Sequence, residues 1–148
     1  MPSFLAGATP RRSTSSLDDM SNDLWRDEAM RRFPDHASAF REAESPYEVW
    51  IDLWIAFQSA YDSGDAGLVA EIYAFAKWCG TQPRGGSADD DLATCVNVCF
   101  VEHIPSHPKA LEDMPRWFTL ADVERMEDTF SYIVGPEGYA KLLARYAV

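Results

Sequence analysis

The stretch "SPYEVWIDLWIAFQSAYDSGD" (residues 45–65) decides the fold. Ser45 followed by Pro46 is typical of a helix start, because serine caps the free amides and proline fits the first helical position. The aromatic residues that follow are spaced 3, 4, 3 and 4 positions apart: Tyr47, Trp50, Trp54, Phe57 and Tyr61. This spacing puts them on one face of a helix, which Val49, Leu53 and Ile55 widen. The pattern predicts a core helix rather than a surface that stacks a ligand.

The next segment, "AGLVAEIYAFAKWCG" (residues 66–80), has the same period. Leu68, Ile72, Phe75 and Cys79 share one face, and Gly80 is a natural C-cap. Because only a few residues join the two segments, we expect them to form an antiparallel helical hairpin.

Other amphipathic segments predict further helices on either side of this hairpin. Thr119 followed by Asp122 resembles a capping box at the start of one of them. We predict an all-α protein of about six helices, with one compact domain over residues 16–148 and a disordered tail over residues 1–15. The helical segments outside the hairpin are residues 21–33, 92–104, 119–134 and 136–148.

The stretch "CVNVCFVEHIPSHP" (residues 95–108) holds the candidate chemistry. It contains two of the three cysteines and two of the three histidines. Residues 92–104 place Cys95, Cys99 and His103 on one face of a nearly all-round buried helix. A strand is the alternative interpretation, because short valine-rich runs fit both structures.

A metal site is one hypothesis for this stretch, with Cys99, His103 and His107 as the candidate ligands. Cys95 and His103 lie about 12 Å apart along a helix, so only an adjacent pair such as Cys99 and His103 could share an ion. Pro105 should end the helix and separate His103 from His107. Buried free thiols are the simpler interpretation, and we expect no metal ion or cofactor.

Glu102 should be partly buried at the end of this helix, where an unpaired carboxylate is destabilising. Its expected partners are Arg84, Arg116, a tryptophan indole, His103 or His107. A carboxylate beside an imidazole can serve acid–base catalysis, so Glu102 and His103 are candidate catalytic residues. A structural ion pair is the favoured interpretation, because no nucleophile or phosphate-binding loop accompanies them.

The charge balance limits the class of partner. The chain carries 24 acidic and 13 basic residues, a formal net charge of −11. Such a surface repels nucleic acid and anionic membranes, whose binding depends on lysine and arginine. Asp89, Asp90 and Asp91 could instead dock on a basic protein. Three cysteines without a disulfide pattern, and no apolar segment of membrane-spanning length, indicate a cytoplasmic protein.

Three segments, "EIYAFAKWC", "VCFVEHIP" and "MPRWF", resemble small bacterial helical families of unknown function. The resemblance covers roughly residues 65–118 and implies no activity.

Together these features predict a protein-binding module, of the immunity or antitoxin type that masks a basic effector. One alternative is a metal-dependent or acid–base hydrolase built around Glu102 and His103. Another is a homo-oligomeric structural module that uses surplus aromatic surface. The sequence leaves the partner and the oligomeric state open.

Overall fold

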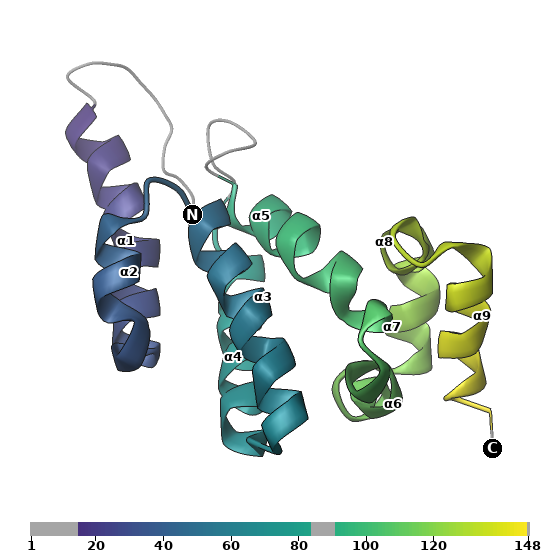
Figure 1. Cartoon of the computed structure of the whole chain (residues 1–148). Helices are drawn as coiled ribbons and strands as arrows, with labels where there is room; N and C mark the ends of the chain where they lie inside the picture. The colour runs from purple at the N-terminus through teal and green to yellow at the C-terminus, as the bar shows by residue number, and fades with distance from the viewer. Residues whose placement is uncertain (1–14, 84–90, 148) are drawn as a thin grey trace.

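The computed structural model describes the backbone of residues 15–83 and 91–147, and the side chains from Leu24 onward within those ranges. This part of the chain is all-helical and contains no strand, so the predicted fold class is confirmed and the strand alternative for residues 92–104 is wrong (Figure 1). None of its helices is both long and apolar enough to cross a membrane. The helices in chain order are α1 (Ser15–Arg32), η2 (Pro34–His36), α2 (Ala37–Glu42), α3 (Pro46–Ser63), α4 (Ala66–Gly80), α5 (Leu92–Cys99), η3 (Val101–Ser106), α6 (Pro108–Trp117), α7 (Leu120–Arg125), α8 (Glu127–Tyr132) and α9 (Gly135–Ala144), where η marks a 3₁₀ helix.

The described residues form nine α-helices, so the prediction of about six was wrong. Helix α6 was not among the predicted helices; it begins at Pro108, which fits the first helical turn, and it contains Pro115. The segment predicted as one helix after Thr119 divides at Met126, whose backbone (φ −104°, ψ 28°) is not helical. Helix α1 begins at Ser15 rather than Ser21. The rest of the predicted tail lies outside the described residues.

Helices α3 and α4 form the hairpin that the short connection predicts (Figure 1). Gly64 ends α3 with φ 80°, a left-handed conformation that glycine adopts without steric cost. Asp65 then begins α4 by accepting a hydrogen bond from the Leu68 amide (3.1 Å). Two residues are therefore enough to reverse the chain.

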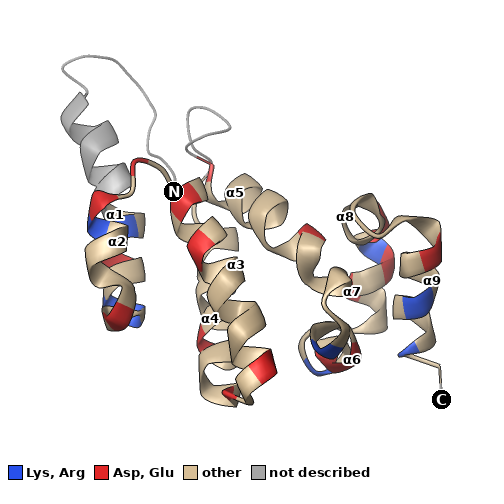
Figure 2. Ribbon diagram, in the orientation of Figure 1, with Lys and Arg blue, Asp and Glu red and all other residues tan. Residues whose placement is uncertain are grey.

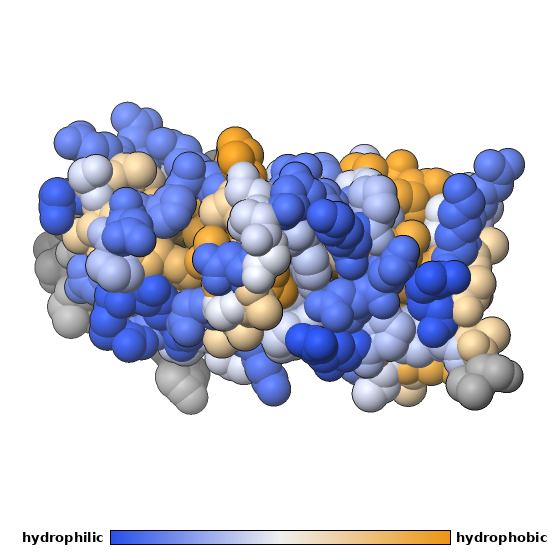
Figure 3. All heavy atoms as spheres, turned by 60° about the horizontal axis from the view of Figure 1, so that its bottom comes forward, coloured by the Kyte–Doolittle hydropathy of each residue, from blue (hydrophilic) through white to orange (hydrophobic). Residues whose placement is uncertain are grey.

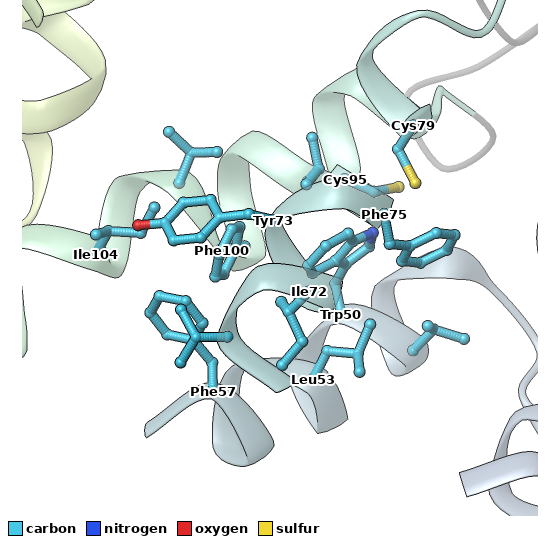
Figure 4. Packing of buried hydrophobic residues seen from close by; sticks show 14 of the residues in the cluster. Trp50, Leu53, Phe57, Ile72, Tyr73, Phe75, Cys79, Cys95, Phe100 and Ile104 are labelled. Carbon is cyan, nitrogen blue, oxygen red and sulfur yellow. The ribbon is translucent and has the colours of Figure 1, made fainter. Parts of the chain in front are cut away.

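Phe100 lies at the centre of an aromatic cluster between this hairpin and the rest of the molecule. Its ring is fully buried, with centroids 5.0 Å from Trp50, 4.8 Å from Phe57 and 5.7 Å from Tyr73. Figure 4 shows the Phe100 ring among these three side chains, which come from both helices of the hairpin. The contacts are edge-to-face or offset, the geometries that aromatic quadrupoles favour.

Helix α5 and η3 connect the hairpin to the C-terminal helices. The chain runs from α5, beside α3 and α4, into η3, which contacts α6, α8 and α9 (Figure 1). Ile104 of η3 is fully buried, as are Met114, Phe130 and Leu142 of these three helices. The core is thus continuous through η3.

Helix α3 turns its aromatic stripe inward as predicted, with one correction. Trp50 and Phe57 are buried, whereas Tyr47, Trp54 and Tyr61 are partly buried at its edge. Ile55 was expected to widen the buried face, but 58% of it is exposed. The reason is angular: Ile55 lies about 160° around the helix from Phe57 or Leu53, beyond the reach of the core.

Replacing Phe100 by alanine should lower the free energy of unfolding by about 3–5 kcal/mol, because the fixed helices around the ring cannot close the cavity. Val98→Ala is the matched control, since Val98 is 43% exposed and its truncation should cost less than about 1 kcal/mol. Urea unfolding followed by tryptophan fluorescence measures both. Equal losses for the two variants would contradict the central role of Phe100.

Candidate functional site

The predicted site divides at Phe100, where the backbone (φ −130°, ψ −64°) leaves the α-helical conformation. Helix α5 ends at Cys99, and Glu102 and His103 lie in η3. A 3₁₀ helix has about three residues per turn, so residues four apart no longer share a face. The spacing that suggested a common site for Cys99, His103 and His107 is therefore lost.

His103 packs on α3. Its ring lies 5.5 Å from the Trp54 ring, and its Nε2 is 3.1 Å from the Val98 carbonyl oxygen. A carbonyl oxygen only accepts hydrogen bonds, so Nε2 carries a proton and donates it. This nitrogen links η3 to the last turn of α5.

His107 caps α6. Its Nδ1 accepts a hydrogen bond from the Ala110 amide (3.4 Å), so Nε2 carries the proton and donates to Asp62 Oδ1 (3.2 Å). Its ring lies 5.9 Å from Tyr61, seven residues along α3 from the Trp54 that His103 contacts. Seven residues correspond to about 10 Å of helix, so the two imidazoles lie beside different parts of α3.

None of the three cysteines forms a disulfide within the described part of the chain, and the surroundings of Cys79 and Cys99 disfavour the thiolate. Burial raises the pKa of Cys79 to about 12, against which the Trp50 indole N–H acts weakly. Figure 4 shows the sulfur atoms of Cys79 and Cys95 on the side of Trp50 that carries this nitrogen. Burial also raises the pKa of the half-buried Cys99 thiol, and the charge of Glu102 adds to the effect. Nucleophilic cysteines have lowered pKa values, so Cys79 and Cys99 suit packing better than catalysis.

Glu102 is half-buried, as expected, and desolvation raises the pKa of its carboxyl while His103 opposes the shift. None of the described residues forms a hydrogen bond or salt bridge with it. Arg116, one of its expected partners, instead lies 3.5 Å from Asp113, and Arg84 is outside the described residues. Glu102 and His103 are thus neighbours whose side chains share no hydrogen bond.

Within residues 24–83 and 91–147, no three histidine, cysteine or acidic side chains are grouped so that they could hold a metal ion. Asp91 is 5% exposed and accepts a hydrogen bond from Thr94 Oγ1 (2.6 Å) at the start of α5. Little of Asp91 is therefore accessible at the surface. Asp89 and Asp90 lie outside the described residues.

A polar cluster that the sequence did not predict joins α3 to α6. Asp113 Oδ2 accepts hydrogen bonds from the Tyr61 hydroxyl (2.6 Å) and the Trp117 indole N–H (3.1 Å). The Trp117 ring stacks on Tyr73 at 4.4 Å, which fixes its orientation. Asp113 and Trp117 are one turn apart on α6, so recognising this helix would have predicted that these two are neighbours; their link to Tyr61 depends on how α6 packs against α3.

The cluster borders an open hollow of about 410 Å³ between the α3–α4 turn and α6. Lys109, Glu112 and Arg116 lie on its rim and are exposed. Burial and the Asp113 carboxylate raise the pKa of Tyr61 far above its ordinary value. Tyr61 therefore keeps its proton at neutral pH, and the geometry supports a structural link more than a catalytic group.

Asp113→Asn should lower the free energy of unfolding by about 1–3 kcal/mol, because two donors lose a charged acceptor. The neighbouring Glu112→Gln removes the same charge from an exposed site and should change stability by less than about 0.5 kcal/mol. Urea unfolding at pH 7 compares them. A null effect of Asp113→Asn would show that the link contributes nothing to folding.

Glu102→Gln should accelerate alkylation of Cys99 about two- to five-fold at pH 8, because removal of the negative charge lowers the pKa of the thiol. Peptide mass spectrometry after iodoacetamide treatment measures the rate, with Glu112→Gln as the control for net charge. Cys79 and Cys95 should stay protected in both variants, since they are fully buried. An unchanged rate would mean that Glu102 does not influence Cys99.

Comparisons with family models, curated proteins and solved structures found no match to this chain. The resemblance of residues 65–118 to bacterial helical families consequently stays a prediction. The functional proposal below depends on the charges and surfaces of the described residues.

Proposed function

We propose that this protein works by binding a basic protein partner through an acidic surface. The observation that carries the proposal is the charge distribution. Between Asp35 and Glu71 the chain has eight acidic residues and one arginine, Arg41, a net charge of −7. Figure 2 shows acidic residues along α3 and at the α3–α4 turn, and α3 contains no lysine or arginine.

The acidic residues of this region are only partly neutralised by basic side chains. Glu42, Glu44 and Glu48 are exposed, and none forms a salt bridge within the described part of the chain. Of the other acids in this stretch, Glu71 pairs with Arg32 of α1 (3.2 Å), while Asp52 and Asp62 each contact a histidine, His36 (2.8 Å) and His107 (3.2 Å). Outside the stretch, Arg32 also pairs with Glu28 (2.7 Å), and Arg125 pairs with Asp122 (2.9 Å). The negative potential is therefore concentrated on η2, α2, α3 and the start of α4, where it would attract and orient a basic partner.

Two observations weigh on the hydrolase alternative. The raised pKa of Glu102 is a property that acid–base catalysts share. However, His103 Nε2 donates to the Val98 carbonyl and its ring packs on Trp54, so that nitrogen is not available to a substrate. We therefore favour the binding function. An immunity or antitoxin role is the form of it that best suits a small acidic chain, and three free thiols are in keeping with a cytoplasmic location.

The test is a pull-down from the protein's own host over a series of salt concentrations. We expect a basic protein to be retained at 50 mM salt and released towards 500 mM, roughly the range over which surface electrostatics are screened. The triple variant Glu42→Gln, Glu44→Gln, Glu48→Gln should bind the recovered partner about ten-fold more weakly, through slower association.

The matched control is Glu124→Gln, Glu127→Gln, Glu137→Gln, which removes the same charge from exposed positions on α7, α8 and α9. It should change the dissociation constant less than two-fold, on the order expected for charges outside an interface. Retention of no basic protein, or equal losses for both triple variants, would refute the proposal.

A further inference from the structure

Helix α3 exposes two isoleucines that the core does not use. Ile51 is 54% exposed and Ile55 is 58% exposed, and because they are four residues apart they lie on one face. On the face of the molecule that Figure 3 shows, hydrophobic residues form small patches between hydrophilic ones. Isoleucine is one of the residue types most often buried, so a pair of them more than half exposed marks a candidate contact surface.

The two isoleucines border a groove of about 310 Å³ between α2 and α3. Ala39 and Ala43 line the α2 side together with Phe40, whose ring is buried beneath. The small alanine side chains leave room above the groove for a segment of a partner protein to contact both α2 and α3.

A helix is the segment that suits this groove. Its apolar residues recur about every 5–6 Å along one face, which is also the spacing of Ile51 and Ile55 on α3.

The charges around the groove specify the partner further. Glu48 and Asp52 line it on the α3 side. Asp52 Oδ2 lies 2.8 Å from His36 Nδ1, which leaves its second oxygen for a basic residue of the partner, and Glu48 Oε2 accepts a hydrogen bond from the Glu44 amide (2.9 Å). Arg41 is the one basic residue, apart from His36, on η2, α2 and α3. A second copy of this chain would bring acidic surface against acidic surface, whereas lysine and arginine beside the apolar stripe of an incoming helix would be attracted.

We infer that the α2–α3 groove is the docking site for a basic amphipathic helix of the partner protein. Aliphatic residues of that helix pack on Ile51 and Ile55, and its flanking lysines or arginines face Glu48 and Asp52. This inference rests on the proposed function and deepens it, since it assigns the acidic surface a specific groove and its partner a specific secondary structure.

The probe is a fluorescein-labelled, 18-residue peptide of leucine and lysine with leucines at helical spacing. Two control peptides have the same length: a scrambled sequence of the same composition, which has no apolar face, and a leucine–glutamate peptide of the same pattern. Fluorescence anisotropy at 150 mM salt should show saturable binding of the first peptide, with binding about ten-fold weaker or undetectable for both controls. Equal binding of the scrambled peptide would reduce the interaction to charge alone and overturn the inference.

The double variant Ile51→Ser, Ile55→Ser should weaken binding of the first peptide at least about ten-fold, because both isoleucines lose the apolar surface that docking would bury. Tyr132→Ser, Ile133→Ser is the matched control, since both residues are exposed (74% and 43%) and lie on α8 or just after it. It should leave binding unchanged. Thermal unfolding of both variants checks that the folded state is intact.

The basic partner recovered from the host gives a second readout that separates the inference from the proposed function. Loss of this partner by the isoleucine variant, and not by the control variant, supports both. Undiminished retention by the isoleucine variant overturns the groove while the binding function stands, and absence of any salt-sensitive partner refutes both. Light scattering of the unmodified chain tests the remaining occupant, a second copy of the chain. A dimer that the isoleucine substitutions dissociate would mean that the groove binds this second copy, and would overturn the inference.

Discussion

The insertion of Phe100 between α3 and α4 is the contact on which the rest of the structure depends. Its ring touches aromatic side chains from both helices of the hairpin, so its burial fixes α5 against them. The same residue is where the chain changes from α5 into η3. The direction of η3, and with it the positions of α6, α8 and α9, is therefore set by a side chain that the aromatic stripe of α3 holds in place.

Much of the helical framework could be predicted from periodicity. The 3-4 spacing of Trp50 and Phe57 gives the buried face of α3, and Thr119 with Asp122 forms the capping box that its spacing indicates. The end of α4 at Gly80 was also predicted, with Thr81 as the C-cap residue. The division at Met126 of the helix predicted after Thr119 was missed, because a local change of backbone conformation leaves no mark on the hydrophobic period. Helix α6, which Pro108 begins, was also missed.

The candidate site was harder to predict than the fold, because it depends on how helices meet. The sequence places Cys99, His103 and His107 four residues apart, but the change to 3₁₀ geometry sends the two histidines to Trp54 and Tyr61. Tyr61 and Asp113 are 52 positions apart and carry no common motif, so their hydrogen bond follows only from the packing of α6 on α3. The acidic character of residues 35–71, in contrast, is readable directly, since net charge does not depend on backbone geometry.

The uneven charge also affects how the protein moves before it touches anything. Residues 35–71 carry a net charge of −7, whereas residues 91–147, with nine acidic and five basic residues, carry −4 over a longer stretch. The molecule therefore has an electric dipole moment, and within about 8–10 Å of an oppositely charged surface, one screening length, it experiences a torque. This torque would turn α3 towards an approaching basic protein before contact, so that a larger fraction of collisions would have a productive orientation.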